Sequence, residues 1–177
     1  MLNKQLELSN QLHGHLEIVQ QGKQFLLSTS QQAYQKVLEP HFSGSAGAHM
    51  RHVLDHYLAV KDGLVSGTIN YNNRNRHSPV ERDPQAALSL WQEIEQWLVG
   101  VCQLDGNLGL KVICESSLLE MQNAQTESTL ARELVFVSSH AVHHYSLMAV
   151  IKSLQGLETD SLFGIAAATV SHQRKQA

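Results

Sequence analysis

Apolar residues recur at helical spacing in four long stretches of this chain, and this recurrence restricts the fold more than any other feature. Residues three or four apart share one face of a helix, so each stretch would carry an apolar face that must be buried. Asp83-Pro84 is a typical helix start, and Gly156 is a typical stop. The pattern predicts four long helices around one core, over about residues 3–27, 46–65, 84–101 and 129–156.

The segments between these stretches predict how the helices are connected. Residues 66–83 are polar and rich in Asn, Arg and Gly, which indicates a long crossover between the second and third helices. An alternating run before the last helix predicts a short β-hairpin; it contains Leu108, Leu110, Val112 and Cys114. We therefore expect an all-α fold, a four-helix bundle with one long crossover, in a single domain over residues 1–177.

Charge and cysteine content argue against several classes of protein. The 13 Lys and Arg are scattered and the formal net charge is −3, so we expect no nucleic-acid partner. No apolar run approaches the roughly 18 residues of a membrane span, so we expect no membrane partner. Cys102 and Cys114 form neither a disulfide framework nor a Cys-x-x-Cys motif. Together these features predict a cytoplasmic protein.

Histidine is the residue type that points to chemistry, because six of the 11 histidines fall within 49–56 and 140–144. His140 and His144 are four residues apart, which stacks two imidazoles on successive turns of a helix. A third nitrogen must come from another helix, and His52 is the best candidate if the two helices face each other. Three protein ligands leave a coordination position open to water or substrate, as in catalytic sites.

A structural role for these histidines is the alternative interpretation. A histidine on an apolar helix face commonly just hydrogen-bonds a backbone carbonyl. Two clusters on separate core helices would bury several imidazoles, however, and unpaired buried imidazoles carry a desolvation cost that a shared metal removes. The residue types suit one divalent transition metal, with zinc or nickel favoured and iron as a further candidate.

The sequence also resembles the DinB-like superfamily of metal-binding four-helix bundles, which includes the YfiT-like proteins and bacterial thiol transferases. The resemblance rests on MRHVLDHY (50–57) and HAVHHYSLMAVIKSLQG (140–156), and extends over INYNNRNR (69–76), ERDPQAA (81–87) and FGIAAATV (163–170). It implies that His52, His140 and His144 are the metal ligands. It also implies a homodimer, since members often pair.

Other residues are expected in the pocket or behind the ligands. His56 or His49 is the candidate for a fourth ligand. His56 could instead act as a base behind the ligands, and a structural hydrogen bond is an equal alternative for it. Asp55 is expected to orient an imidazole. Tyr71 and Arg74, in the long connection, are expected to fold over the pocket mouth.

The absence of other motifs narrows the chemistry. Ala141 stands where a zinc protease has its glutamate, and no Glu-x-x-His pair or phosphate loop occurs. We expect a metal-dependent enzyme with a small-molecule substrate. Transfer of a low-molecular-weight thiol to an electrophile is favoured by the resemblance, and hydrolysis of a small molecule is the other reaction considered. The alternative function is a non-enzymatic metal- or ligand-binding module for sensing or protein interaction.

Overall fold

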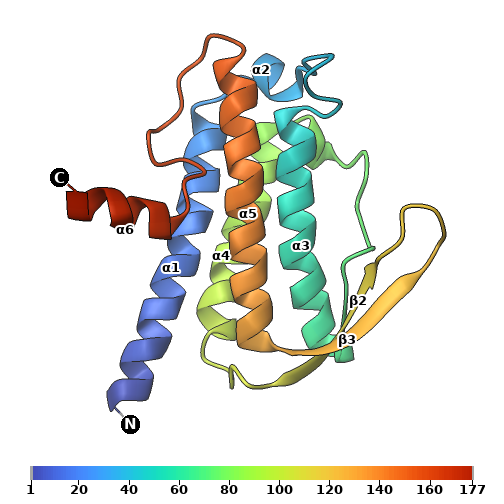
Figure 1. Ribbon diagram of the computed structural model, residues 1–177, viewed down its shortest axis with the longest axis vertical. Helices are drawn as coiled ribbons and strands as arrows, with labels where there is room; N and C mark the ends of the chain where they lie inside the picture. The colour runs from blue at the N-terminus through green and yellow to red at the C-terminus, as the bar shows by residue number, and fades with distance from the viewer. Residues whose placement is uncertain (1, 177) are drawn as a thin grey trace.

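The computed structural model describes residues 2–176, and the side chains of residues 12–176. Four long helices run roughly along the long axis of the molecule (Figure 1): α1 Leu2–Leu27, α3 Ala46–Ser66, α4 Pro84–Val101 and α5 Leu130–Ser153. Shorter helical elements are α2 Gln31–Gln35, the 3-10 helix η1 Pro79–Glu81 and α6 Ala167–Gln176. The strands are β1 Thr68–Asn70, β2 Gly109–Glu115 and β3 Asn123–Thr129.

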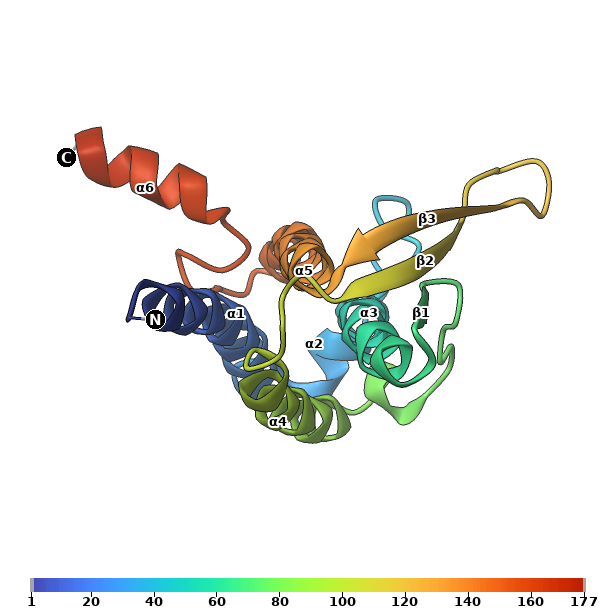
Figure 2. The same cartoon turned by 90° about the horizontal axis from the view of Figure 1, so that it is seen from below.

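The prediction of an all-α four-helix bundle is wrong, because the three strands form a mixed sheet in the order β1-β2-β3. β2 and β3 pair antiparallel as a hairpin that extends away from the helices beside α3 and α5 (Figure 2). β1 pairs with β2 in parallel, with Ile69 opposite Val112. The protein therefore combines packed helices with a sheet.

Strand β1 lies inside the segment that the sequence indicated to be a polar crossover. Gly67 ends α3 with a φ of 77°, a left-handed conformation that glycine adopts without strain, and the chain turns directly into β1. Ile69 is fully buried against α3, where a side chain on Gly63 would collide with it. This strand has three residues, one buried side chain and a partner that is distant in the sequence. It is therefore too short to show the alternation of apolar and polar residues from which a strand is predicted.

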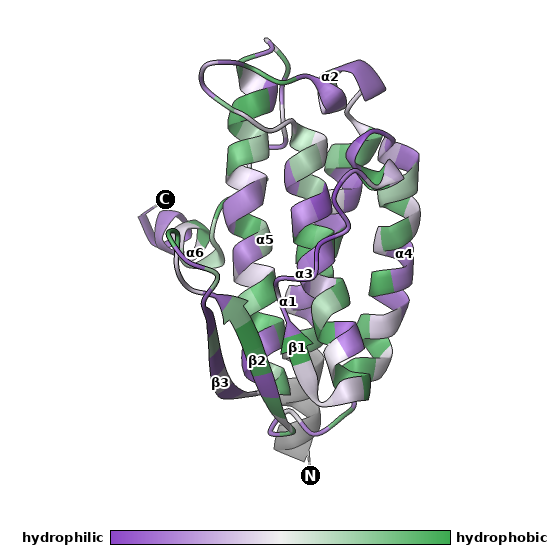
Figure 3. Ribbon diagram, turned by 90° about the vertical axis from the view of Figure 1, so that its right-hand side faces the viewer, coloured by the Kyte–Doolittle hydropathy of each residue, from purple (hydrophilic) through white to green (hydrophobic). Residues whose placement is uncertain are grey.

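Helix starts follow the capping residues in the sequence. Ser45 caps α3 by accepting from the Ala48 amide, Asp83 caps α4, and Thr129 caps α5. Hydrophobic and hydrophilic residues alternate along the helices (Figure 3), as expected of helices that bury one face. One cluster of buried side chains reaches from Val19 to Phe163, and its largest members are Trp91, Tyr34, Tyr57 and Tyr145.

Helix α5 passes through this core beside α3 (Figure 1). Within residues 2–176 it is the one helix that is long and apolar enough to cross a membrane, a test that buried core helices also pass. It carries His140 and His144, so packing against α3 brings the two histidine clusters of the sequence together.

Candidate metal centre

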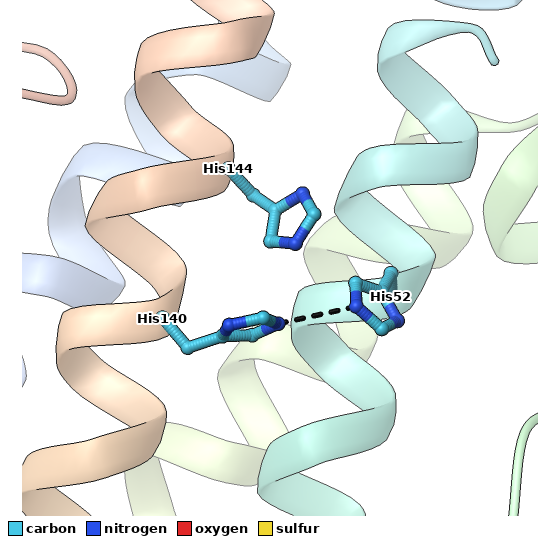
Figure 4. Close-up of side chains that lie close together, drawn as sticks. All are labelled: His52, His140 and His144. Carbon is cyan, nitrogen blue, oxygen red and sulfur yellow. Dashed lines mark hydrogen bonds between the residues drawn. The ribbon is translucent and has the colours of Figure 1, made fainter. Parts of the chain in front are cut away.

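Three histidines from α3 and α5 point toward one another (Figure 4). His52 extends from α3, and His140 and His144 extend from successive turns of α5. One nitrogen of each imidazole can be chosen so that all three lie within 4.8 Å of one another. The structure thus brings together the three residues that were predicted from the sequence to be metal ligands.

The spacing within the cluster suits a small cation. The Nε2 atoms of His52 and His140 are 3.1 Å apart, and the His144 ring centroid lies 4.6 Å from each of the other two. Ligand nitrogens on a tetrahedral ion with bonds of about 2.0–2.1 Å stand roughly 3.3 Å apart. The His52–His140 pair already has this separation, and a nitrogen of His144 lies within 4.8 Å of both.

The nitrogen of His52 that faces the cluster is Nε2, 3.1 Å from Nε2 of His140. The Nδ1 atom, on the other side of the ring, is buried and has no hydrogen-bond partner among the described residues. A metal held by Nε2 would not contact Nδ1, so the unpaired atom is no evidence for a metal.

Burial also fixes the protonation of the three rings. It lowers the pKa of His52 to about 2, of His144 to about 3 and of His140 to about 4, and repulsion from neighbouring imidazoles adds to the effect. The Arg74 guanidinium further lowers the pKa of His52 and His140. All three rings are therefore neutral at pH 7, the form in which histidine binds metals.

His49 and His56 are close to the cluster, but each is bonded through Nδ1 to another group. His49 Nδ1 lies 2.9 Å from His144 Nδ1, so these two rings share a proton and the Nε2 atom of His144 stays available as a ligand. His56 Nδ1 donates to the His52 carbonyl at 2.8 Å, the structural hydrogen bond that was one of its expected roles. The three-ligand group includes neither residue.

Asp55 was expected to orient an imidazole, and the structure shows a different role. Its carboxylate accepts from Arg51 Nη1 at 2.9 Å and from the amide and the side chain of Asn75, each at 3.2 Å. Arg51 also donates to Glu81 at 2.8 Å. This partly buried network ties the segment after β1 to α3. The opposite charges four residues apart in Arg51 and Asp55 are a local signal that could have identified the pair.

Tyr71 was expected at the pocket mouth, but it is buried beside His56. The two rings stack with centroids 5.1 Å apart, and the Tyr71 hydroxyl donates to Glu133 at 2.6 Å. Burial and this bond raise the pKa of Tyr71. Glu133, a buried carboxylate on α5, was not recognised from the sequence; nothing local distinguishes it from a surface glutamate.

A cavity of about 350 Å³ opens beside the histidine cluster. Its walls include Phe42, His49, His52, Arg74, His144 and Leu147. Arg74 therefore does face the pocket next to the candidate metal centre. A larger cavity of about 480 Å³ lies between α1 and residues 158–163, away from the cluster, and its lining shows no comparable set of ligands within the described chain.

Comparison with known proteins identifies no family. No protein-family model matches the chain. A curated protein named FK506-binding protein 5, from Rhizopus delemar, is 34% identical over 119 residues, which cover 66% of this chain. The match spans 30% of the length of that relative, and its name describes the whole protein.

Proposed function

We propose that this protein binds one divalent transition metal, zinc or nickel in the first instance and iron as a further candidate, through His52, His140 and His144. The observation that carries the proposal is the convergence of three neutral imidazoles from two helices to within 4.8 Å.

We further propose that the centre serves an enzyme that acts on a small substrate. Three protein ligands leave a position free, and His52 and His144 both line the adjacent cavity, so a substrate could reach that position. A divalent metal there would favour the anionic form of a bound thiol or water at neutral pH. His49 would hold the His144 ring in orientation, and Phe42 and Leu147 would exclude water from one wall.

Thiol transfer is the reaction we favour, on the strength of the resemblance to the DinB-like superfamily. In such a transfer the thiol gives its proton to solvent, and its sulfur forms a bond to an electrophilic carbon of the second substrate. The bond from that carbon to a leaving group breaks, and the leaving group departs with the electron pair. No redox partner is needed.

A ligand-binding module without catalysis is the second candidate. It is favoured by the relative whose name describes binding of FK506. The two candidates differ in what they require of the histidines. Binding of FK506 need not involve the cluster, whereas a metalloenzyme loses its function with the ligands.

Elemental analysis tests the metal proposal. Purified protein incubated with zinc or nickel and then desalted should hold about one equivalent, and a His52→Ala, His140→Ala double variant should hold none. His143→Ala is the matched control, because His143 is an exposed histidine on the same helix. Lack of metal in the parent, or metal retained by the double variant, would overturn the proposal. A thermal shift with FK506 that the double variant preserves would favour the second candidate.

A further inference from the structure

The cavity beside the histidine cluster has a positive character that the protein as a whole lacks. Three imidazole ligands are neutral, so they leave the full charge of a divalent ion uncompensated. Among the described residues that line the cavity there is no aspartate or glutamate, whereas Arg51 and Arg74 both contribute. The whole chain has a formal net charge of −3, so this concentration of positive charge is local.

The two arginines differ in how much of their charge is available. Arg51 is held by two carboxylates, Asp55 at 2.9 Å and Glu81 at 2.8 Å, and these largely neutralise it. For Arg74, no hydrogen bond or ion pair is found to any residue between 12 and 176. Arg74 lines the cavity beside the histidine cluster without an ion pair to a described residue, and it also borders a second cavity that Asp55 and Asp62 line.

An exposed arginine on a loop is commonly just solvated, but the backbone of this loop is anchored on both sides of Arg74. Asn72 donates to Asn123 at 2.7 Å and accepts from the Glu115 amide at 2.7 Å, which fastens it to the sheet. Asn75 is bonded twice to Asp55 on α3. The anchors restrict where the Arg74 side chain can reach, which is a requirement for selective recognition.

We propose that Arg74 recognises a carboxylate on the substrate of the metal centre, and that the substrate class is therefore small organic thiols that carry a carboxylate. A guanidinium binds a carboxylate through two parallel hydrogen bonds. The thiol would occupy the free metal position, and the carboxylate would lie against Arg74 within a cavity of about 350 Å³. This inference rests on the proposed function and identifies the substrate class for the same site.

Cobalt-loaded protein and three simple thiols provide the test. The probes are 3-mercaptopropionate, 2-mercaptoethanol and cysteamine, which are negative, neutral and positive at pH 7. Binding is followed by the absorption that appears when a thiolate coordinates cobalt. We expect 3-mercaptopropionate to bind about two- to fivefold more tightly than 2-mercaptoethanol, the factor expected for an ion pair that is partly exposed to solvent, and cysteamine to bind most weakly.

Variants separate the role of Arg74 from general electrostatics. Arg74→Gln should lower the affinity for 3-mercaptopropionate more than the affinity for 2-mercaptoethanol and so remove the preference, and Arg74→Lys should keep part of it. Arg76→Gln is the matched control. It removes the same charge two residues along the chain, and Arg76 does not line the cavity. It should keep the full preference.

Failure of the proposed function and failure of the role assigned to Arg74 give different results in this experiment. If the parent takes up no cobalt, or takes it up and binds none of the three thiols, the proposed function is overturned and this inference with it. If the parent binds all three thiols with equal affinity, or Arg74→Gln keeps the preference, the metal centre stands and the assignment of Arg74 is overturned.

Discussion

His49 and His144 meet through their Nδ1 atoms at 2.9 Å, one from the first turn of α3 and the other from the middle of α5. Only one of the two nitrogens can carry the shared proton. The contact therefore requires that one ring be protonated at Nδ1 and the other not, and it restrains the orientation of His144. Such a partner behind a metal-binding imidazole commonly strengthens metal affinity as well as geometry.

Removing His49 should weaken metal binding without abolishing it. We expect His49→Ala to lower the affinity for zinc by about 10–100-fold, because the His144 ring loses its orienting partner. The stoichiometry at saturation should stay at one. Competition with a chromophoric chelator measures the change, and His172→Ala, which alters an exposed histidine on α6, is the control. An unchanged affinity would mean that the His49–His144 contact has no part in the site.

The metal-free protein should become less stable as the pH falls from about 7 to 4. Burial holds the pKa of His52, His140 and His144 at about 2, 4 and 3, whereas unfolded histidine titrates near 6.5. Below pH 6.5 the unfolded chain binds more protons than the folded chain, so protonation favours unfolding. Thermal unfolding at pH 7.5, 6.0 and 5.0 should show a decreasing Tm, with a shallower decrease for His52→Gln and the parental slope for His172→Gln. A Tm independent of pH over this range would contradict the buried, neutral state of the cluster.

Tyr71 should matter for stability and not for metal content. Its hydroxyl donates to Oε2 of Glu133, a carboxylate that is 1% exposed and whose Oε1 accepts from Ser128 and Arg132. Tyr71→Phe should lower the free energy of unfolding by about 1.5–3 kcal/mol, the range for a hydrogen bond to a charged group. Tyr145→Phe, which removes a bond to the neutral carbonyl of Ile18, should cost less, about 0.5–1.5 kcal/mol.

Urea denaturation and elemental analysis together check the Tyr71 prediction. Metal loss in Tyr71→Phe at full stability would assign Tyr71 to the site instead of the core.

The histidine cluster could be predicted because its signal is local. His140 and His144 are one helical turn apart, so a helix alone brings them together, and His52 needed only one further assumption, that α3 and α5 are neighbours. The start of α4 at Asp83-Pro84 was readable for the same reason. The strand β2 was also visible, since its buried residues Leu110 and Val112 alternate with exposed ones.

The errors lie where partners are distant in the sequence. The all-α prediction failed because β1 forms only by pairing with β2, where Val112 lies more than forty residues from Ile69. Within β1 itself, Ile69 is the only buried residue. Asp55 was expected to orient an imidazole because histidines are its neighbours in the sequence. In the structure its carboxylate accepts hydrogen bonds from Asn75, in the loop after β1. A carboxylate has no periodic signature, so its partner follows only from the three-dimensional arrangement.

The close approach of α3 to η1 should make Gly47 intolerant of any side chain. A Cβ atom at this position would collide with the Glu81 backbone carbonyl and with the Tyr34 ring, whereas one at Gly14 on α1 would meet nothing within 4 Å. Gly47→Ala should therefore lower the free energy of unfolding by about 1–3 kcal/mol. Gly14→Ala should raise it by about 0.5–1 kcal/mol, because alanine is the better helix former. Because Glu81 also accepts from Arg51, the collision should loosen the loop that carries Arg74 as well. Urea denaturation of both variants tests the packing directly, and equal stability of the two would mean that α3 does not approach η1 as closely as the structure indicates.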